Sequence, residues 1–303
     1  MIPILMLRTT AGALSIDAEA SDHLAANPGP GRVHSVFNRV VNVLSDSNKL
    51  VALCAGKLDD APWSVRVDIP HWTKWRLTAG DDVRLSSAAI VFAGRAPGVV
   101  RLTEAAKWYT NYVPVDIGHD ELGRRAKALA ALLYVHGVRG EALTAFDAEI
   151  RNCLAQACTA LVAAIRRGDA AGVAGAATSL LGLGPGLTPA GDDFLTGMAL
   201  LAAQPRSRLS WIAPVIGRVL DDGPERTTLL SRTTLREALR GRARQCLLDL
   251  LPVLLAPDPD GRLEERLRIH AGPVLGIGHT SGTDILSGLL TGLRLEEELR
   301  GFM

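Results

Sequence analysis

The chain has 303 residues, of which 48% are hydrophobic, 21% charged and 4% aromatic, and its formal net charge is +1. This length suits two domains better than one core. The near-zero charge excludes a general electrostatic attraction to nucleic acid or to an anionic membrane. We therefore expect a globular protein with a core of Ala, Leu and Val, whose partner is a small ligand or another protein.

The amino-terminal residues 1–8 are apolar, but no basic residue precedes the apolar run, which makes a poor signal peptide. No apolar run reaches the roughly 18 residues that a membrane-spanning helix needs. The cysteines have no paired metal-ligand spacing, and we interpret them as small buried side chains in a reducing compartment. We expect a cytoplasmic protein. The cysteines are Cys54, Cys153, Cys158 and Cys246.

Residues 1–115 are predicted to form a small antiparallel β barrel or sandwich. A short helix is expected at residues 17–24, and short β-rich runs separated by Gly and Pro follow it. The predicted strands cover residues 33–37, 50–54, 63–69, 83–85 and 89–92.

Residues 116–303 are predicted to form a mostly α-helical domain, so that the fold class is α+β. The apolar residues recur with helical period, and Gly and Pro interrupt them. The predicted helices cover residues 127–135, 145–166, 170–181, 193–203, 209–220, 229–239, 242–255, 263–270 and 284–300.

The most distinctive stretch is residues 182–197, Gly-Leu-Gly-Pro-Gly-Leu-Thr-Pro-Ala-Gly-Asp-Asp-Phe-Leu-Thr-Gly. Clustered glycines, such as Gly184, Gly186 and Gly191, allow the main chain to approach another group closely. Thr188 followed by Pro189 predicts a helix N-cap with proline at the first helical position. The free N–H groups of that helix would then bind phosphate or carboxylate.

Residues 276–288 repeat this pattern with one residue deleted. Two glycine-capped helices could also resemble each other without a shared site. In the repeat, Ser281 and Asp284 have the spacing of a capping box. The matched positions are Gly184, Gly186 and Thr188 with Gly276, Gly278 and Thr280, and Gly191, Asp193, Leu195 and Gly197 with Gly282, Asp284, Leu286 and Gly288.

Asp193 and Asp284 are the carboxylates that the two motifs share. They could favour the helix dipole only, or they could reach a common site and there hold a divalent cation, bind an amide or ammonium group, or act as a general base. Asp192 lies about 100° from Asp193 around the helix, and one of the two could be a surface charge. His279, inside the second loop, could transfer a proton or donate to an oxyanion.

Residues 225–234 form a third polar segment between the two motifs. Thr227 and Ser231 are spaced to share one helical face, with Thr228 beside them. Such hydroxyls cap helices as often as they bind ligands. Arg226 and Arg232 could pair with a carboxylate or phosphate.

No phosphate loop, His-Glu-x-x-His motif or nucleophile elbow occurs in the sequence, and the glycine-rich stretch lacks the dinucleotide-binding pattern. The glycine motif, the Thr-Thr-Leu-Leu-Ser segment at 227–231 and Gly-His-Thr-Ser-Gly-Thr-Asp at 278–284 instead resemble the AllH-like family of bacterial proteins, of the oxamate carbamoyltransferase subunit type. The resemblance implies carbamoyl transfer between oxalurate and phosphate in purine and allantoin breakdown, within a multi-subunit complex. It assigns no catalytic residue.

We therefore expect a carbamoyltransferase-type subunit that binds a small anionic, amide-bearing ligand in its helical domain. The catalytic candidates are Asp193, Asp284 and His279. The alternatives are a non-catalytic assembly subunit and, third, a ligand-sensing protein. The ligand-binding candidates are Gly184, Gly186, Thr188, Gly191, Asp192, Thr227, Thr228, Ser231, Gly278, Thr280 and Ser281.

Overall fold

The computed structural model describes residues 9–93, 97–110, 121–137 and 144–301. The chain divides into two compact units, residues 1–111 and 112–303. The predicted domain boundary at residue 115 and the apolar start of the chain lie outside the described residues. Within the described ranges, no helix combines the length and the apolar character that crossing a membrane requires.

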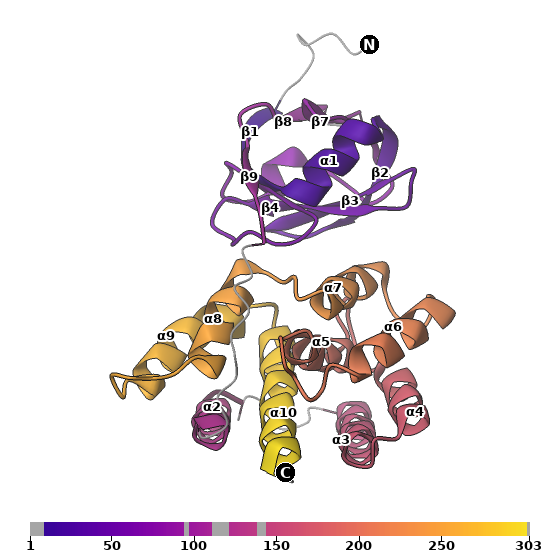
Figure 1. The fold of residues 1–303 in the computed structure, drawn as a ribbon. Helices are drawn as coiled ribbons and strands as arrows, with labels where there is room; N and C mark the ends of the chain where they lie inside the picture. Colours follow the sequence, from indigo (N-terminus) through magenta and orange to yellow (C-terminus); the bar gives the residue numbers. More distant parts are fainter. Residues whose placement is uncertain (1–8, 94–96, 111–120, 138–143, 302–303) are drawn as a thin grey trace. The chain divides into compact units, whose positions relative to one another are not determined.

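The first unit is a closed β barrel (Figure 1). Its strands follow one another in the order β5-β4-β3-β2-β6-β7-β8-β1, and β1 pairs with β5 to close the ring, while β9 extends the sheet beyond β1. The strands are β1 (Thr9–Asp17), β2 (Gly29–Val36), β3 (Val40–Ser45), β4 (Leu50–Ala55), β5 (Ser64–Val67), β6 (Asp82–Leu85), β7 (Ala89–Phe92), β8 (Gly98–Arg101) and β9 (Ala106–Trp108).

The barrel is mixed, so the prediction of a purely antiparallel sheet was wrong. β1 runs parallel to β8 and β9, and β4 runs parallel to β5. A parallel pair needs a crossover connection, and residues 56–63 supply one between β4 and β5. The first strand, β1, was not predicted, and it closes the barrel.

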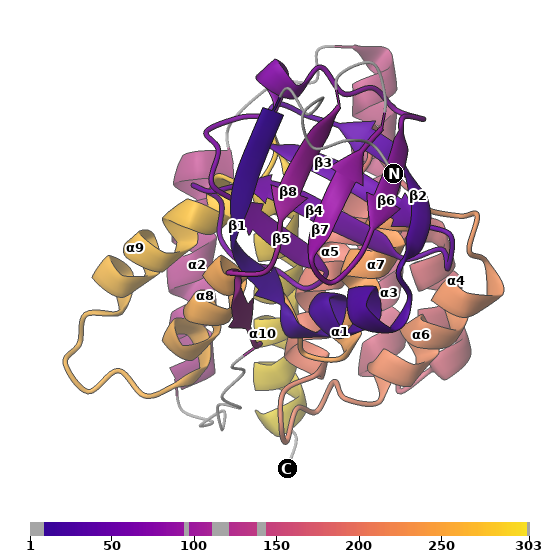
Figure 2. The same ribbon diagram turned by 90° about the horizontal axis from the view of Figure 1, so that it is seen from above.

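The helix of this unit, α1 (Ala18–Ala26), lies beside the ends of the strands (Figure 2). Asp17 caps it, because the Asp17 side chain accepts a hydrogen bond from the Ala20 N–H. Ala20 and Leu24 are fully buried in the barrel core. The aromatic part of that core is made by Trp72, Trp75 and Phe92, whose rings stack at tilted and edge-on angles.

The described part of the second unit is helical, as the periodicity predicted. Its two most extensively packed helices, α5 and α10, form the centre, and the other helices lie around them (Figure 1). The helices are α2 (Leu122–Gly137), α3 (Ala145–Arg166), α4 (Ala170–Leu180), α5 (Ala190–Ala202), α6 (Ile212–Asp222), α7 (Leu229–Leu239), α8 (Gln245–Leu255), α9 (Leu263–Leu275) and α10 (Ser281–Gly301).

Several predicted helix ends differ from the observed ones. The helix predicted over residues 263–270 continues to Leu275, with Pro273 inside it. Proline in the last turn removes one backbone donor only.

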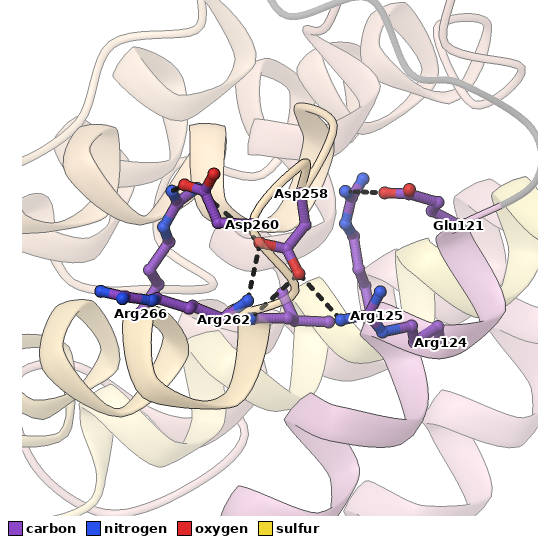
Figure 3. Close-up of polar contacts among 8 residues, drawn as sticks. Glu121, Arg124, Arg125, Asp258, Asp260, Arg262 and Arg266 are labelled. Atoms are coloured by element: carbon purple, nitrogen blue, oxygen red, sulfur yellow. Dashed lines mark hydrogen bonds and ion pairs between the residues drawn. The ribbon is translucent and has the colours of Figure 1, made fainter.

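An ion-pair network around Asp258 connects α2 with the start of α9 (Figure 3). The Asp258 carboxylate accepts hydrogen bonds from the N–H groups of Arg262 and Leu263, and it pairs with Arg124 at 2.8 Å. Arg125 is almost fully buried and pairs with Glu121. These contacts hold α2 and the start of α9 together.

Candidate functional site

Helices α5 and α10 approach each other through two glycines at equivalent positions. A Cβ atom on Gly197 would lie 2.1 Å from the Ile285 carbonyl oxygen, and a Cβ on Gly288 would lie 2.0 Å from the Phe194 carbonyl oxygen. Residues 194 and 285 are 91 positions apart, as are 197 and 288, so the two contacts are reciprocal. The repeated sequence thus packs against itself as a local pseudo-twofold pair, and only glycine allows this distance.

The loops before the two helices close with the same hydrogen bonds. In the first, Leu183 N–H donates to Leu180 and Gly191 N–H to the Leu183 carbonyl; in the second, Ile277 N–H donates to Val274 and Gly282 N–H to the Ile277 carbonyl. Leu180 and Val274 are 94 positions apart, but the helices match at 91. Measured between these hydrogen-bonded residues, the second loop is three residues shorter than the first. The sequence pattern had predicted that it is shorter by one residue.

Both predicted helix caps were wrong by about one residue. α5 begins at Ala190 and its N-cap is Pro189, without a side-chain cap. α10 begins at Ser281, so that Ser281 is helical and does not form a capping box with Asp284. The two hydroxyls meet each other instead, with Thr188 Oγ1 and Ser281 Oγ 2.9 Å apart. This contact brings the two loops together, as the shared-site hypothesis requires.

In the first turn of α5, the N–H groups of residues 191–193 are not free, whereas that of Ala190 has no acceptor among the described residues. Gly191 N–H donates to Leu183, and the N–H groups of Asp192 and Asp193 donate to the Pro189 carbonyl. The N–H groups of the glycine-rich loop before α5 are different. Among the described residues, no acceptor faces the N–H groups of residues 184 and 186–188. Gly186, at φ +94° and exposed, has open space around it. Available donors therefore lie in the loop and at the first residue of the helix, Ala190.

Asp192 holds the first loop in place. Its carboxylate accepts from the Gly182 N–H at 2.9 Å and from the Thr227 hydroxyl. Asp192 is almost fully buried, and burial raises its pKa while these two donors and Ser231 lower it. Both carboxylate oxygens have partners within the chain, so Asp192 is a structural bridge between the loop and residues 226–231.

The Thr-rich segment packs on the first loop. Thr228 is the N-cap of α7 and also donates to the Leu187 carbonyl at 2.6 Å. Ser231 donates to the same carbonyl at 3.4 Å. Thr227 precedes the helix, so the prediction that Thr227 and Ser231 share a helical face was wrong. The segment does come to the glycine loop, and its hydroxyls bind the protein there.

Asp193 differs from its neighbour because one of its oxygens has no partner. Its side chain is 4% exposed, and Oδ2 has no hydrogen-bond donor among the described residues. Burial raises the pKa of Asp193 to about 8. Hydrogen bonds from Ser281 and Thr188 oppose the rise, and the charges of Asp284 and Asp192 add to it. Near neutral pH, Asp193 is therefore mostly in its acid form.

Asp284, the matching residue of the second copy, also has an unpartnered buried oxygen. Its Oδ2 has no donor in the described parts of the chain. Burial raises the pKa of Asp284 to about 6, and the Thr280 hydroxyl opposes this. On α3, Cys158 is close enough for the Asp284 charge to act on it: burial and that charge raise the pKa of the thiol to about 11. Nothing in the amphipathic pattern of α3 indicated this position for Cys158.

We use the name paired-loop site for Thr188, Asp193, Thr280, Ser281 and Asp284. His279 belongs to the second loop but is exposed, and it makes no hydrogen bond to another described residue. In the described ranges, no three His, Cys, Asp or Glu side chains gather as metal ligands would.

Buried oxygens that accept no hydrogen bond are costly. The paired-loop site is therefore chemically suited to a ligand that brings N–H or O–H donors. Its two carboxyl groups, with one proton between them near neutral pH, could hold an amide and exchange a proton with it.

Two family models match the chain. The model described as AllH family N-terminal domain matches residues 12–107, which include most of the barrel. The model described as Oxamate carbamoyltransferase subunit AllH matches residues 180–293, which contain both glycine motifs and α7. No solved structure matches the chain.

Proposed function

Because this chain belongs to the AllH family, we propose that it is a subunit of a carbamoyltransferase-type complex and binds a small anionic, amide-bearing ligand at the paired-loop site. The observation that carries the proposal is the pair of unpartnered oxygens, Asp193 Oδ2 and Asp284 Oδ2. A primary amide or carbamoyl group carries N–H donors beside a carbonyl acceptor. It therefore meets a need that the protein leaves open at equivalent positions of the two copies.

The anionic part of the ligand would be bound by the first loop. The unpartnered N–H groups of residues 184 and 186–188 are donors of the kind that bind phosphate or carboxylate. Arg226, which is exposed and has no carboxylate partner among the described residues, could add a charge. Gly278 and His279 would play the corresponding part in the second loop.

The chemistry follows from carbamoyl transfer between phosphate and oxamate. In the direction of transfer to oxamate, its nitrogen attacks the carbamoyl carbon, the carbon–oxygen bond to phosphate breaks, and the nitrogen loses a proton. Asp284, the more acidic of the two, would accept that proton, and Asp193 would orient the amide. Donors that stabilise the developing oxyanion contribute most of the rate enhancement in reactions of this type.

The test is ligand binding by the purified full-length chain. Oxamate and carbamoyl phosphate should each raise its melting temperature at pH 7, and Asp193→Ala should abolish the shift. In the assembled complex, Asp284→Asn should abolish turnover without unfolding the protein, because it removes the proton acceptor. Full activity of that variant would exclude the catalytic role, and a chain that gains no stability from either compound would not own the site.

A non-catalytic assembly subunit is the second candidate, and the glycine packing favours it. Gly191, Gly197, Gly282 and Gly288 each have a backbone atom closer than a Cβ tolerates, so packing alone accounts for them. Under this alternative the chain should co-purify with its partner subunits and stabilise them, with no shift in melting temperature on adding oxamate.

The proposed function also includes a cytoplasmic location and a role in purine and allantoin breakdown.

A further inference from the structure

The two carboxyl groups of the paired-loop site are alike in sequence but not in their surroundings. Asp193 has hydroxyl donors from both loops, Thr188 and Ser281, whereas Asp284 has Thr280 of its own loop. Asp193 is almost fully buried, and Asp284 is partly buried. In each, Oδ2 has no donor among the described residues. A ligand therefore meets two oxygens in different environments.

Resting on the proposed function, we infer that the pair recognises one primary carboxamide or ureido group as a unit. Asp193, in its acid form, donates to the carbonyl oxygen, and Asp284, as a carboxylate, accepts from the neighbouring N–H. A planar amide presents one acceptor and one donor side by side, which is the complement of a carboxylic acid next to a carboxylate. The inference assigns different roles to two residues that the repeat makes equivalent.

Electrostatics support one shared proton and not two charges. Asp284 is near enough for its charge to raise the pKa of Asp193, so a single proton remains on the more buried of the two, Asp193. The pKa of Asp193 is raised to about 8, first by burial, and that of Asp284 to about 6, also by burial. Between these values the site holds one acid and one carboxylate, which is the form that fits an amide.

Among the described residues, no cation contributes to the raised pKa of Asp193 or of Asp284. Asp192, on α5, adds negative field to Asp193, and Cys158, on α3, faces Asp284 as a neutral thiol. Several charged groups of the other packed helices have contacts of their own. These are Arg232 with the Pro224 carbonyl and Arg236 with Asp221 on the α7 side, Arg166 with Glu298 between α3 and α10, Arg300 with Glu296 within α10, and Arg124 with Asp258 on the α2 side.

The recognition scheme predicts discrimination between an amide and the carboxylate of the same shape. Oxalate differs from oxamate by an oxygen in place of the NH₂ group. At the position where oxamate donates to Asp284, oxalate would place a negatively charged acceptor against a carboxylate. A site built around a hydrogen-bond donor rejects an analogue without it strongly, because the buried acceptor is then left unpaired.

The experiment measures binding of oxamate and of oxalate to the full-length chain by calorimetry from pH 5 to pH 9. Oxamate should bind best between about pH 6 and pH 8 and weaken on both sides, and oxalate should bind at least about tenfold more weakly at pH 7. The Asp193→Asn variant should still bind oxamate, but its affinity should no longer fall above pH 8. The introduced side-chain amide donates a hydrogen bond at every pH, because it does not titrate. Asp284→Asn should lose the acidic decrease and bind more weakly.

The outcomes separate this inference from the proposed function. Equal affinity for oxalate and oxamate, a flat pH profile, or a strict requirement for Mg²⁺ would overturn the amide recognition and leave ligand binding by this site standing. If neither compound binds at any pH, the proposed function fails and this inference fails with it. Far-ultraviolet circular dichroism of both Asn variants shows whether they fold. If only one variant folds, it still tests one side of the affinity–pH curve: Asp193→Asn the alkaline side, or Asp284→Asn the acidic side.

Discussion

The two copies of the glycine motif share one packing interface but differ in what holds their loops. In the first copy, Asp192 ties Gly182 and Thr227 together, and α7 donates to the Leu187 carbonyl. In the second copy, the position equivalent to Asp192 is Thr283. Gly278, His279 and Thr280 are exposed there. The helices are thus constrained equally, whereas, among the described residues, only the first loop is braced from outside.

This difference separates residues that build the fold from residues that are available to a ligand. Gly197 and Gly288 are required because the backbones of α5 and α10 come too close there for a Cβ atom. Asp192 is required because its carboxylate holds the first loop in place. Asp193 and Asp284 are the polar groups that neither requirement explains, because each keeps an oxygen without a donor among the described residues. Four predictions test this comparison.

The largest effect is expected from adding one methyl group at the helix crossing. Gly197→Ala and Gly288→Ala should each lower the free energy of unfolding by about 3 kcal/mol, because the Cβ would meet a carbonyl oxygen of the facing backbone, which cannot move aside. Urea denaturation measures this. Gly272→Ala in α9 is the control: its Cβ has open space, and it should gain up to about 1 kcal/mol from helix propensity. Unequal losses at 197 and 288 would contradict the reciprocal contact.

The sequence predicted some helix boundaries of the second, helical unit correctly. α3 and α7 begin and end at the predicted residues. Their starts are easy to predict, because Thr144 and Thr228 are standard N-cap residues whose side chains accept a hydrogen bond from an N–H of the first helical turn. The pairing of the glycine motifs could also be read from the sequence. The partners of Asp192 and the burial of Asp193 could not, since both depend on residues far along the chain. The parallel strands of the barrel were missed for the same reason.

The second prediction concerns the dependence of stability on pH. The folded-state pKa of Asp193 is raised to about 8 from an ordinary value of 3.8, so the folded chain binds this proton more tightly than the unfolded chain does. The stability contributed by the proton is complete below about pH 4 and is lost as pH rises toward 8. Between pH 5 and pH 8 the loss should be on the order of 3 kcal/mol.

Asp193→Asn should remove this slope, and thermal unfolding across that pH range measures it. Asp284→Asn tests the second copy: it should remove a smaller slope that ends near pH 6, because the pKa of Asp284 is raised only to about 6. Identical slopes for the two variants would contradict the asymmetry between the copies.

The third prediction tests the bracing of the first loop. Asp192→Ala should cost about 1 to 3 kcal/mol, because the Gly182 N–H and the Thr227 hydroxyl lose their acceptor. The matched change in the second copy, Thr283→Ala, should stay within about 0.5 kcal/mol. Hydrogen exchange should speed up at Gly182 in the first variant only. A Thr283→Ala variant as unstable as Asp192→Ala would mean that the second loop is braced too.

The smallest effect is expected where the two loops meet. Thr188→Val and Ser281→Ala each remove one hydroxyl from the 2.9 Å contact, and a double-mutant cycle should give a coupling energy of about 0.5 to 1 kcal/mol. Because both hydroxyls also lower the pKa of Asp193, either change should move the alkaline end of the stability slope to higher pH. Thr280→Val is the control, since its hydroxyl acts on Asp284 instead. A Thr280→Val variant that moved the Asp193 titration, or zero coupling between 188 and 281, would mean that the two loops do not form one site.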